Sequence, residues 1–77
     1  MFSKEIFSKR LFEIRKQHNL NQLQLGKIVG LTQMAISRIE NAERAASIEV
    51  LDKLADYFNI SLDYLVGRSN DPTPPNR

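Results

Sequence analysis

Apolar residues recur at helical spacing along most of the chain, and no segment shows the alternation of apolar and polar residues that is typical of a β-strand. The helical segments are short, and residues that favour helix ends, such as Asn19, Gly30 and Asn59, stand between them. A chain of 77 residues has room for one domain, and its lack of cysteine excludes a disulfide scaffold, a zinc finger and a thiol nucleophile. The sequence therefore predicts one all-α domain that holds no metal and no cofactor.

Five helices are expected from the positions of capping and apolar residues. The first spans residues 3–18 and the second residues 22–29, while Thr32, Ser47 and Ser61 cap the third, fourth and fifth. The apolar residues expected to face the core are Phe7, Leu11, Ile14, Leu25, Val29, Ile36, Ile39, Ile48, Leu51, Leu54, Ala55, Phe58, Leu62 and Leu65.

Only Gly30 and Leu31 separate the second helix from the residue that caps the third. At the start of the second helix, Asn21 can accept a hydrogen bond from the N–H of Gln24, and the Gln24 amide can reach back to Asn21, which makes a capping box. Two short helices joined by a tight, glycine-containing turn form a helix-turn-helix arrangement. The third helix then turns a polar N-terminal surface outward, with Gln33 at its start.

The chain divides into a helical part, residues 1–67, and a tail, residues 68–77, that contains all three prolines and no residue of a buried type. We expect the first part to be the folded domain and the second to be flexible. No apolar run approaches the roughly 20 residues of a membrane span, and residues 1–10 lack the apolar stretch of a signal peptide. The sequence therefore predicts a cytoplasmic protein without a membrane partner.

The formal net charge of +2 conceals an uneven distribution. Residues 1–38 hold seven Lys and Arg against two Glu, a net +5, whereas residues 39–77 hold four Lys and Arg against seven Asp and Glu, a net −3. This distribution is expected if one end of the molecule faces a polyanion and the other faces solvent or a partner. Chance clustering of charged residues is the alternative.

The stretch from Arg10 to Gly67 carries an ordered set of short motifs, which are Leu20-Asn21-Gln22, Leu25-Gly26, Val29-Gly30-Leu31-Thr32-Gln33, Ile36-Ser37-Arg38-Ile39-Glu40-Asn41 and Ser61-Leu62-Asp63-Tyr64-Leu65. With these motifs at this spacing, the chain resembles the phage-repressor and Cro-type helix-turn-helix family, also called Xre-like. The resemblance implies a compact five-helix, lambda-repressor-like DNA-binding domain whose third helix enters the major groove.

The resemblance places four residues of the third helix at the bases. Gln33 falls on the position that contacts adenine in the family, and a Gln amide can pair with adenine N6 and N7. Arg38 can pair with guanine O6 and N7, Met34 can contact a thymine methyl group, and Ser37 can contact a base or a phosphate. The alternative is that the polar side chains are solvated or, for Arg38, in an ion pair, and that Met34 fills a gap in the core.

Contacts to the DNA backbone are also implied. The resemblance places Gln22, at the start of the second helix, and Asn41, just after the third, against phosphate groups. Exposed N–H groups at the start of the second helix add to the Gln22 contact. Lys27 and Arg44 are further candidates for phosphate contact, and a solvated surface position is the alternative for both.

Arg15 and Glu40 are expected to form a structural ion pair. In the family, an Arg of the first helix pairs with a Glu that ends the third helix, which holds the third helix on the domain and turns the guanidinium toward phosphate. Arg15 is therefore a candidate for both roles. If the pair is buried, removal of one partner costs about 3–5 kcal/mol.

Some positions depart from the family pattern. Gly26 stands where the family usually has Ala, and a small residue there lets the second and third helices cross closely. Ala42 stands where the family usually has Gly, and because the residues from Ala42 to Ala46 are compatible with helix, we expect that the third helix can continue for a further turn. Leu23 and Ile28 are apolar where the family is commonly polar, either as incidental surface or as a small contact patch.

The function implied by the resemblance is a sequence-specific transcriptional regulator, most simply a repressor that occupies a palindromic operator in double-stranded DNA. One small domain makes few contacts, so a homodimer on two half-sites about 34 Å apart is expected. The acidic second half is the expected place for the dimer contact, with Tyr57, Phe58, Tyr64 and Val66 as candidates. The alternative is that most of these side chains belong to the core.

A protein-interaction module with the same fold, such as an antitoxin or anti-repressor component, is the alternative function. An enzyme is not expected, because the chain contains no nucleophile motif and no phosphate-binding loop. The one histidine, His18, has no neighbouring residues that suit a metal site, and its position suits the end of the first helix instead.

Overall fold

The computed structural model describes residues 3–74, and over that range it contains five helices and no strand. The helices are α1 (Lys4–Gln17), α2 (Gln22–Val29), α3 (Gln33–Glu40), α4 (Ile48–Phe58) and α5 (Leu62–Leu65). The predicted five-helix, all-α fold is confirmed. Within the same residues, no helix combines the length and the apolar character that crossing a membrane requires.

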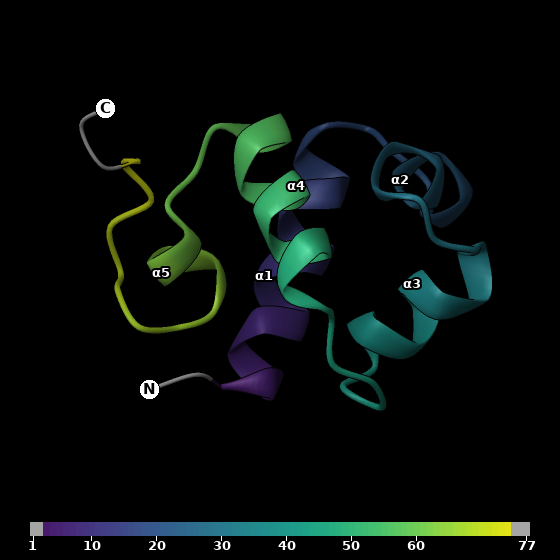
Figure 1. Ribbon diagram of the computed structural model, residues 1–77, viewed down its shortest axis with the longest axis horizontal. Coiled ribbons are helices and arrows are strands. Elements are labelled where there is room, and N and C mark those ends of the chain that lie inside the picture. Colours follow the sequence, from purple (N-terminus) through teal and green to yellow (C-terminus); the bar gives the residue numbers. More distant parts are fainter. Residues whose placement is uncertain (1–2, 75–77) are drawn as a thin grey trace.

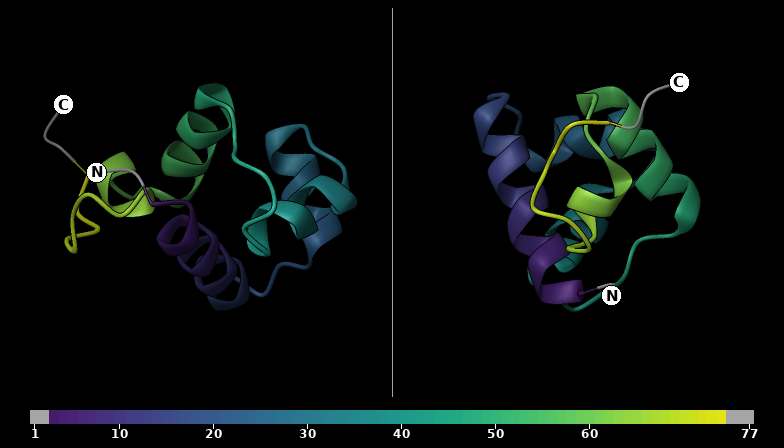
Figure 2. Two further views of the ribbon diagram at one scale, coloured as in Figure 1. Left: turned by 90° about the horizontal axis from the view of Figure 1, so that it is seen from below. Right: turned by 90° about the vertical axis from the view of Figure 1, so that its left-hand side faces the viewer.

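The helices are arranged so that the helix-turn-helix pair and the last helix lie at opposite ends of the molecule. Figure 1 shows α2 and α3 together at one end and α5 at the other, with α1 and α4 between them. The quarter-turn view in Figure 2 shows the same separation, with the beginning of α1 and the segment after α5 on the side away from α2 and α3. The helix-turn-helix pair is thus kept apart from the two ends of the described chain.

Each helix begins after a residue whose side chain accepts a hydrogen bond from the N–H three residues further on. These residues are Ser3, Asn21, Thr32, Ser47 and Ser61. The predicted capping box is present, with 2.7 Å between Asn21 Oδ1 and Gln24 N and 2.8 Å between Gln24 Oε1 and Asn21 N. Left-handed residues stand after α1, α2 and α4 at Asn19, Gly30 and Asn59, as predicted.

The core runs between α1 and α4 and reaches the inner faces of the other helices. Its fully buried large side chains are Phe7, Leu11, Leu25, Ile36, Ile39, Leu54 and Leu65. Two residues expected in the core lie on the surface instead, since Ile48 is 76% exposed and Leu62 is 38% exposed. Each is the first residue of its helix, outside the packed face, and in α4 the buried place is taken by Val50.

Helix α3 ends at Glu40, so the expected further turn of helix is wrong. Ala42 has a φ of +59°, in the left-handed region. Its N–H donates to the carbonyl of Ile39 at 3.1 Å, and the N–H of Glu43 donates to the carbonyl of Arg38 at 2.9 Å. Helices commonly end on a glycine with this hydrogen-bond pattern. An alanine in this conformation costs roughly 1–2 kcal/mol, a strain that glycine does not carry.

The turn between α2 and α3 leaves no room for a side chain at Gly26. A Cβ atom at this position would collide with the carbonyl oxygen of Leu31, whose N–H donates to the Gly26 carbonyl at 2.8 Å. Alanine, which the family usually has here, would force the backbone of the turn to shift. Gly26 therefore allows a contact of backbone on backbone that fixes how α2 meets α3.

The side chain of Arg10 on α1 fastens the segment that follows α5. Its guanidinium donates to the carbonyl oxygen of Tyr64, to that of Ser69 at 2.8 Å and to Oδ1 of Asn70 at 3.0 Å. The guanidinium carbon also lies 4.0 Å from the centre of the Tyr64 ring, which is a cation–π contact. One arginine thus joins α1 both to α5 and to the residues beyond it.

Further hydrogen bonds follow along this segment. The N–H of Ser61, at the start of α5, donates to the carbonyl of Pro72 at 2.8 Å. The Asp71 carboxylate accepts the N–H of Thr73 at 3.0 Å, and this bond, together with one from the Thr73 side chain, lowers the pKa of the Asp71 carboxyl below its usual value. The segment is therefore attached at several points, most of them main-chain groups.

This attachment differs from the flexible tail expected over residues 68–77. Residues 68–72 fold back on the domain, because N–H and carbonyl groups of this segment find partners there even though the side chains are not of a buried type. Composition alone does not reveal such contacts. Residues 75–77, the last part of the expected tail, lie outside the described residues.

Candidate nucleic-acid interface

The N-terminal half of α3 presents its predicted base-contacting side chains to solvent. Gln33 is exposed, Ser37 is partly exposed, and Met34 is 65% exposed. Together with Gln22 of α2 they line an open hollow of about 340 Å³. An exposed fraction this large excludes the alternative that Met34 fills a gap in the core. The hollow thus brings one apolar and three polar side chains together.

Four other predicted contact residues are exposed around the two helices. Arg38 lies in the last turn of α3, and Asn41 lies at the C-cap of that helix. Lys27 lies in the last turn of α2. Because α3 ends at Glu40, Arg44 belongs to the loop between α3 and α4 rather than to a helix. Their side chains are therefore available to a polyanion that approaches this end of the molecule.

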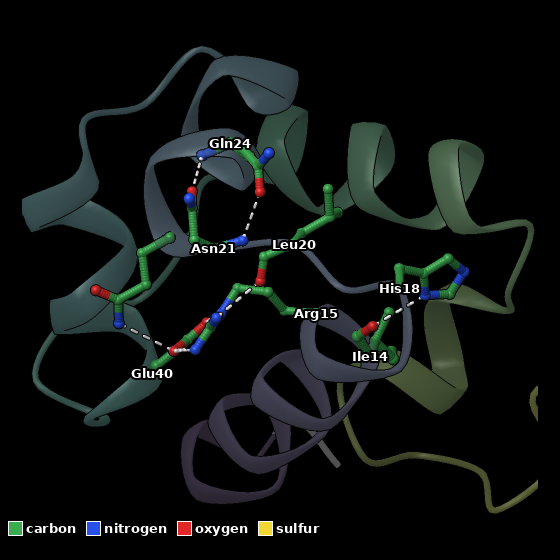
Figure 3. Close-up of polar contacts among 8 residues, drawn as sticks. Ile14, Arg15, His18, Leu20, Asn21, Gln24 and Glu40 are labelled. Atoms are coloured by element: carbon green, nitrogen blue, oxygen red, sulfur yellow. Dashed lines mark hydrogen bonds and ion pairs between the residues drawn. The ribbon is translucent and has the colours of Figure 1, made fainter.

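Arg15 and Glu40 form the expected ion pair (Figure 3). Arg15 Nε lies 2.6 Å from Glu40 Oε2, and Arg15 Nη2 lies 3.0 Å from Glu40 Oε1. The third guanidinium nitrogen, Nη1, donates to the carbonyl of Leu20 at 2.9 Å. The two side chains are only 9% and 5% exposed. Because all three nitrogens bond within the protein, this geometry favours the structural role of Arg15 over a phosphate contact.

Gln22 also belongs to this network. Its Nε2 donates to Oε1 of Glu40 at 3.1 Å, so the amide at the start of α2 is held beside the end of α3. The predicted phosphate-contacting residue and the predicted structural carboxylate are thus hydrogen-bonded to each other. The single carboxylate of Glu40 fixes a side chain of α1 and a side chain of α2 at once.

A second hollow, of about 510 Å³, lies where the end of α1 meets the start of α2. Its lining consists of Arg15, Lys16, Asn19, Leu20, Asn21 and Gln24. The first N–H groups of a helix lack partners within the helix and attract anions. The exposed Lys16 next to them is a further candidate for phosphate contact. It was not among the residues predicted from the sequence, although the basic pair Arg15-Lys16 at the end of the first helix was a signal.

Ser8 is a second residue whose contact could not be predicted from the sequence. It lies on the buried side of α1 and is 4% exposed. Its hydroxyl lies 2.6 Å from the carbonyl oxygen of Ile39, near the end of α3, and 2.8 Å from that of Lys4 in its own helix. A small polar residue between the core residues Phe7 and Leu11 was the only signal for this contact. Ser8 and Arg15 therefore contact two consecutive residues at the end of α3, Ser8 the carbonyl of Ile39 and Arg15 the side chain of Glu40.

The aromatic and apolar residues predicted to form a dimer contact do not share one surface. Phe58 and Val66 are 8% and 7% exposed and belong to the core. Tyr64 is partly buried and covered by Arg10, and only Tyr57 is largely exposed, at 56%. Burial in the core, the alternative that the sequence left open, therefore holds for two of the four.

The comparisons with known proteins fit this geometry. A family model described as Helix-turn-helix (HTH_3) matches residues 11–65. The chain is 33% identical over 69 residues to the antitoxin PezA of Streptococcus pneumoniae serotype 4, and 37% identical over 67 residues to the HTH-type transcriptional regulator PuuR of Escherichia coli K12. These matches cover 90% and 87% of this chain but 44% and 36% of the two relatives. The chain thus spans less than half the length of either.

One solved structure is matched over nearly the whole length of its own chain. The P22 c2 repressor, in complex with a synthetic operator, is 33% identical with a TM-score of 0.77, and the match covers 83% of this chain and 97% of that one. The fold is therefore lambda-repressor-like, and the family model covers more than half of the chain. The chain belongs to the phage-repressor and Cro-type helix-turn-helix family.

Proposed function

We propose that the protein is a sequence-specific transcriptional regulator that binds double-stranded DNA by placing α3 in the major groove of an operator. The observation that carries this proposal is the exposed start of α3, where Gln33, Met34 and Ser37 line one hollow with Gln22. The similarity to a repressor that was solved with an operator supports it, because that match spans 97% of the repressor chain.

The side chains divide into base contacts and backbone contacts. Gln33 pairs with an adenine and Arg38 with a guanine, while Met34 lies against a thymine methyl group. Ser37 contacts a base or a neighbouring phosphate. The phosphate contacts that position the domain come from the partly exposed Gln22 and from four exposed residues, which are Lys16 at the end of α1, Lys27, Asn41 and Arg44.

The regulator acts as a homodimer, and each subunit contacts one half of a palindromic operator with the half-sites about 34 Å apart. We place it in the cytoplasm, where it represses by occupying DNA and without enzymatic activity. Of the predicted dimer residues, the exposed Tyr57 remains a candidate for the contact.

A protein-interaction role is the second candidate function. The observation that favours it is the match to the antitoxin PezA, which covers 90% of this chain. The two functions differ in one property: a regulator of the proposed kind prefers particular DNA sequences, whereas a protein-interaction module binds DNA weakly and without sequence preference.

Selection of bound sequences from a pool of random duplex DNA separates the two functions. A palindromic consensus is expected, and the absence of any consensus would favour the protein-interaction role. The substitution Gln33→Ala is then expected to cost about 1–3 kcal/mol of binding free energy and to relax the preference at one base position.

Two matched variants complete this experiment. Gln22→Ala is expected to weaken binding to all sequences alike, because phosphate contacts carry no sequence information. Gln17→Ala, which changes an exposed glutamine at the end of α1, is the control and is expected to leave affinity and preference as they are. Unchanged affinity and preference in the Gln33 variant would overturn the base contact assigned to Gln33.

A further inference from the structure

We propose that Ser8 is a positioning residue for the DNA-contacting helix, and that its hydroxyl sets how α3 is presented to the bases. This inference rests on the proposed function of α3. Ser8 lies outside the DNA-contacting surface, since it is 4% exposed and lies on α1. It acts through α3, because its hydroxyl lies 2.6 Å from the carbonyl oxygen of Ile39.

The end of α3 is held by α1 at two points. Ser8 contacts the main chain at Ile39, and Arg15 contacts the side chain of the next residue, Glu40. Ser8 and Arg15 are two helical turns apart on the same face of α1, a separation of about 10 Å along its axis. The contact of Ser8 restrains rotation of the main chain of α3 directly, whereas that of Arg15 acts through the side chain of Glu40.

The apolar packing of α3 does not fix rotation in the same way. Ala35, Ile36 and Ile39 are buried, and their contacts are non-directional, so a small rotation of the helix retains them. Hydrogen bonds depend on direction, and the one from Ser8 reaches the main chain itself. The Ser8 hydroxyl is therefore suited to limit a rotation of α3 that the apolar contacts permit.

A small rotation of α3 about its C-terminal end displaces the residues at its N-terminal end. Gln33 is the first residue of α3 and Glu40 is the last, so Gln33 lies about 10 Å along the helix axis from the held end. The contact of Gly26 with Leu31 leaves the start of α3 only a small range of movement. A tilt of about 3° about the held end already displaces Gln33 by about 0.5 Å, the range within which binding residues need to stay. Loss of the Ser8 hydroxyl is therefore expected to affect base preference more than general affinity for DNA.

The Ser8 hydroxyl is not needed to satisfy the Ile39 carbonyl. That oxygen also accepts the N–H of Ala42 at 3.1 Å, so Ser8→Ala leaves no unpaired carbonyl there. The hydroxyl also lies 2.8 Å from the carbonyl of Lys4, a contact within α1 that carries no information about α3. A purely structural role would thus appear as a modest loss of stability, with base preference unchanged.

The test compares Ser8→Ala with Ser61→Ala in the full chain. Ser61 caps α5, far from α3, and its substitution lowers stability by the loss of a cap without a change at α3. The measured quantity is the ratio of two affinities, one for the duplex recovered from the random pool and one for the same duplex with the base facing Gln33 changed. Ser8→Ala is expected to lower this ratio about three- to tenfold, the range for one hydrogen bond, and Ser61→Ala to leave it unchanged.

A second measurement on the same variants works without DNA. The backbone amide shifts of residues 33–42 are expected to change in Ser8→Ala and to stay fixed in Ser61→Ala. An unchanged affinity ratio in Ser8→Ala, with a loss of stability similar to that of Ser61→Ala, would overturn the inference. If the parent chain itself shows no base preference, the proposed function fails, and the amide shifts alone then decide whether Ser8 positions α3.

Discussion

Helix α1 holds two parts of the molecule with two arginines, and it holds them in different ways. Arg15 is buried and binds a carboxylate at the end of α3, the helix proposed to contact DNA. Arg10 lies nearer the surface and binds mainly main-chain carbonyls in and beyond α5. The first contact joins two charges away from water, whereas the second joins a charge to neutral groups that water can replace.

This difference separates a contact on which the fold depends from one that is local. A buried charge that loses its partner cannot recover its hydration, so the whole domain bears the cost. A partly exposed guanidinium that loses its partners remains solvated, so only the attached segment is released. We therefore expect the end of α3 and the segment after α5 to respond very differently when their arginine contacts are removed.

The largest effect is expected from Glu40→Ala. This substitution leaves Arg15 buried without its carboxylate and also removes the partner of Gln22. We expect the free energy of unfolding, measured with urea, to fall by about 3–5 kcal/mol. The double variant Arg15→Met/Glu40→Met is expected to recover much of this loss, because neither side chain then carries a buried charge. A loss well below 1 kcal/mol in the single variant would show that the pair is not buried in solution.

A smaller effect is expected from Arg10→Met, which retains an unbranched apolar side chain and removes the charged guanidinium group. The free energy of unfolding is expected to fall by about 1–2 kcal/mol, and DNA binding to stay as it is. The more direct signal is faster hydrogen exchange at the N–H of Ser61, whose partner is the Pro72 carbonyl. Lys9→Met, on an exposed neighbour, is the control. Unchanged exchange at Ser61 would mean that Arg10 does not fasten the segment.

The smallest effect is expected from Ala42→Gly, and it has the opposite sign. Ala42 is left-handed at the end of α3, whereas Gly67 takes the left-handed position after α5. Glycine at position 42 removes the strain of a Cβ atom, so the free energy of unfolding is expected to rise by about 0.5–1 kcal/mol. Ala45→Gly, in the same loop but not left-handed, is expected to lower it. Equal losses in both variants would contradict the left-handed conformation of Ala42.

The helix starts could be predicted because their signals are local. Asn21, Thr32, Ser47 and Ser61 each cap the helix expected from the sequence, since a cap needs only the three residues that follow it. The end of α3 could not be predicted in this way. Ala42 is compatible with helix, yet it takes a left-handed conformation and α3 ends at Glu40.

In the candidate site, too, some residues could be predicted from the sequence and others could not. The exposed side chains of α3 could be placed from the resemblance and the helical spacing, and the Arg15–Glu40 pair could be placed from the resemblance alone. Ser8 and Arg10 could not, because each donates to main-chain carbonyls far along the chain, and a carbonyl has no signature in the sequence. Such contacts become visible only when the fold brings the two segments together.

The position of the two ends of the described residues, 3 and 74, has a practical consequence for measurement. The N–H of Ser3 donates to the carbonyl of Val66 at 3.0 Å, so the beginning of α1 and the end of α5 lie together, on the side away from α2 and α3 (Figure 2). A fluorophore or a surface tether coupled at residue 73 would therefore sit far from the proposed DNA contacts. Binding could then be followed on immobilised protein with the helix-turn-helix open to solution.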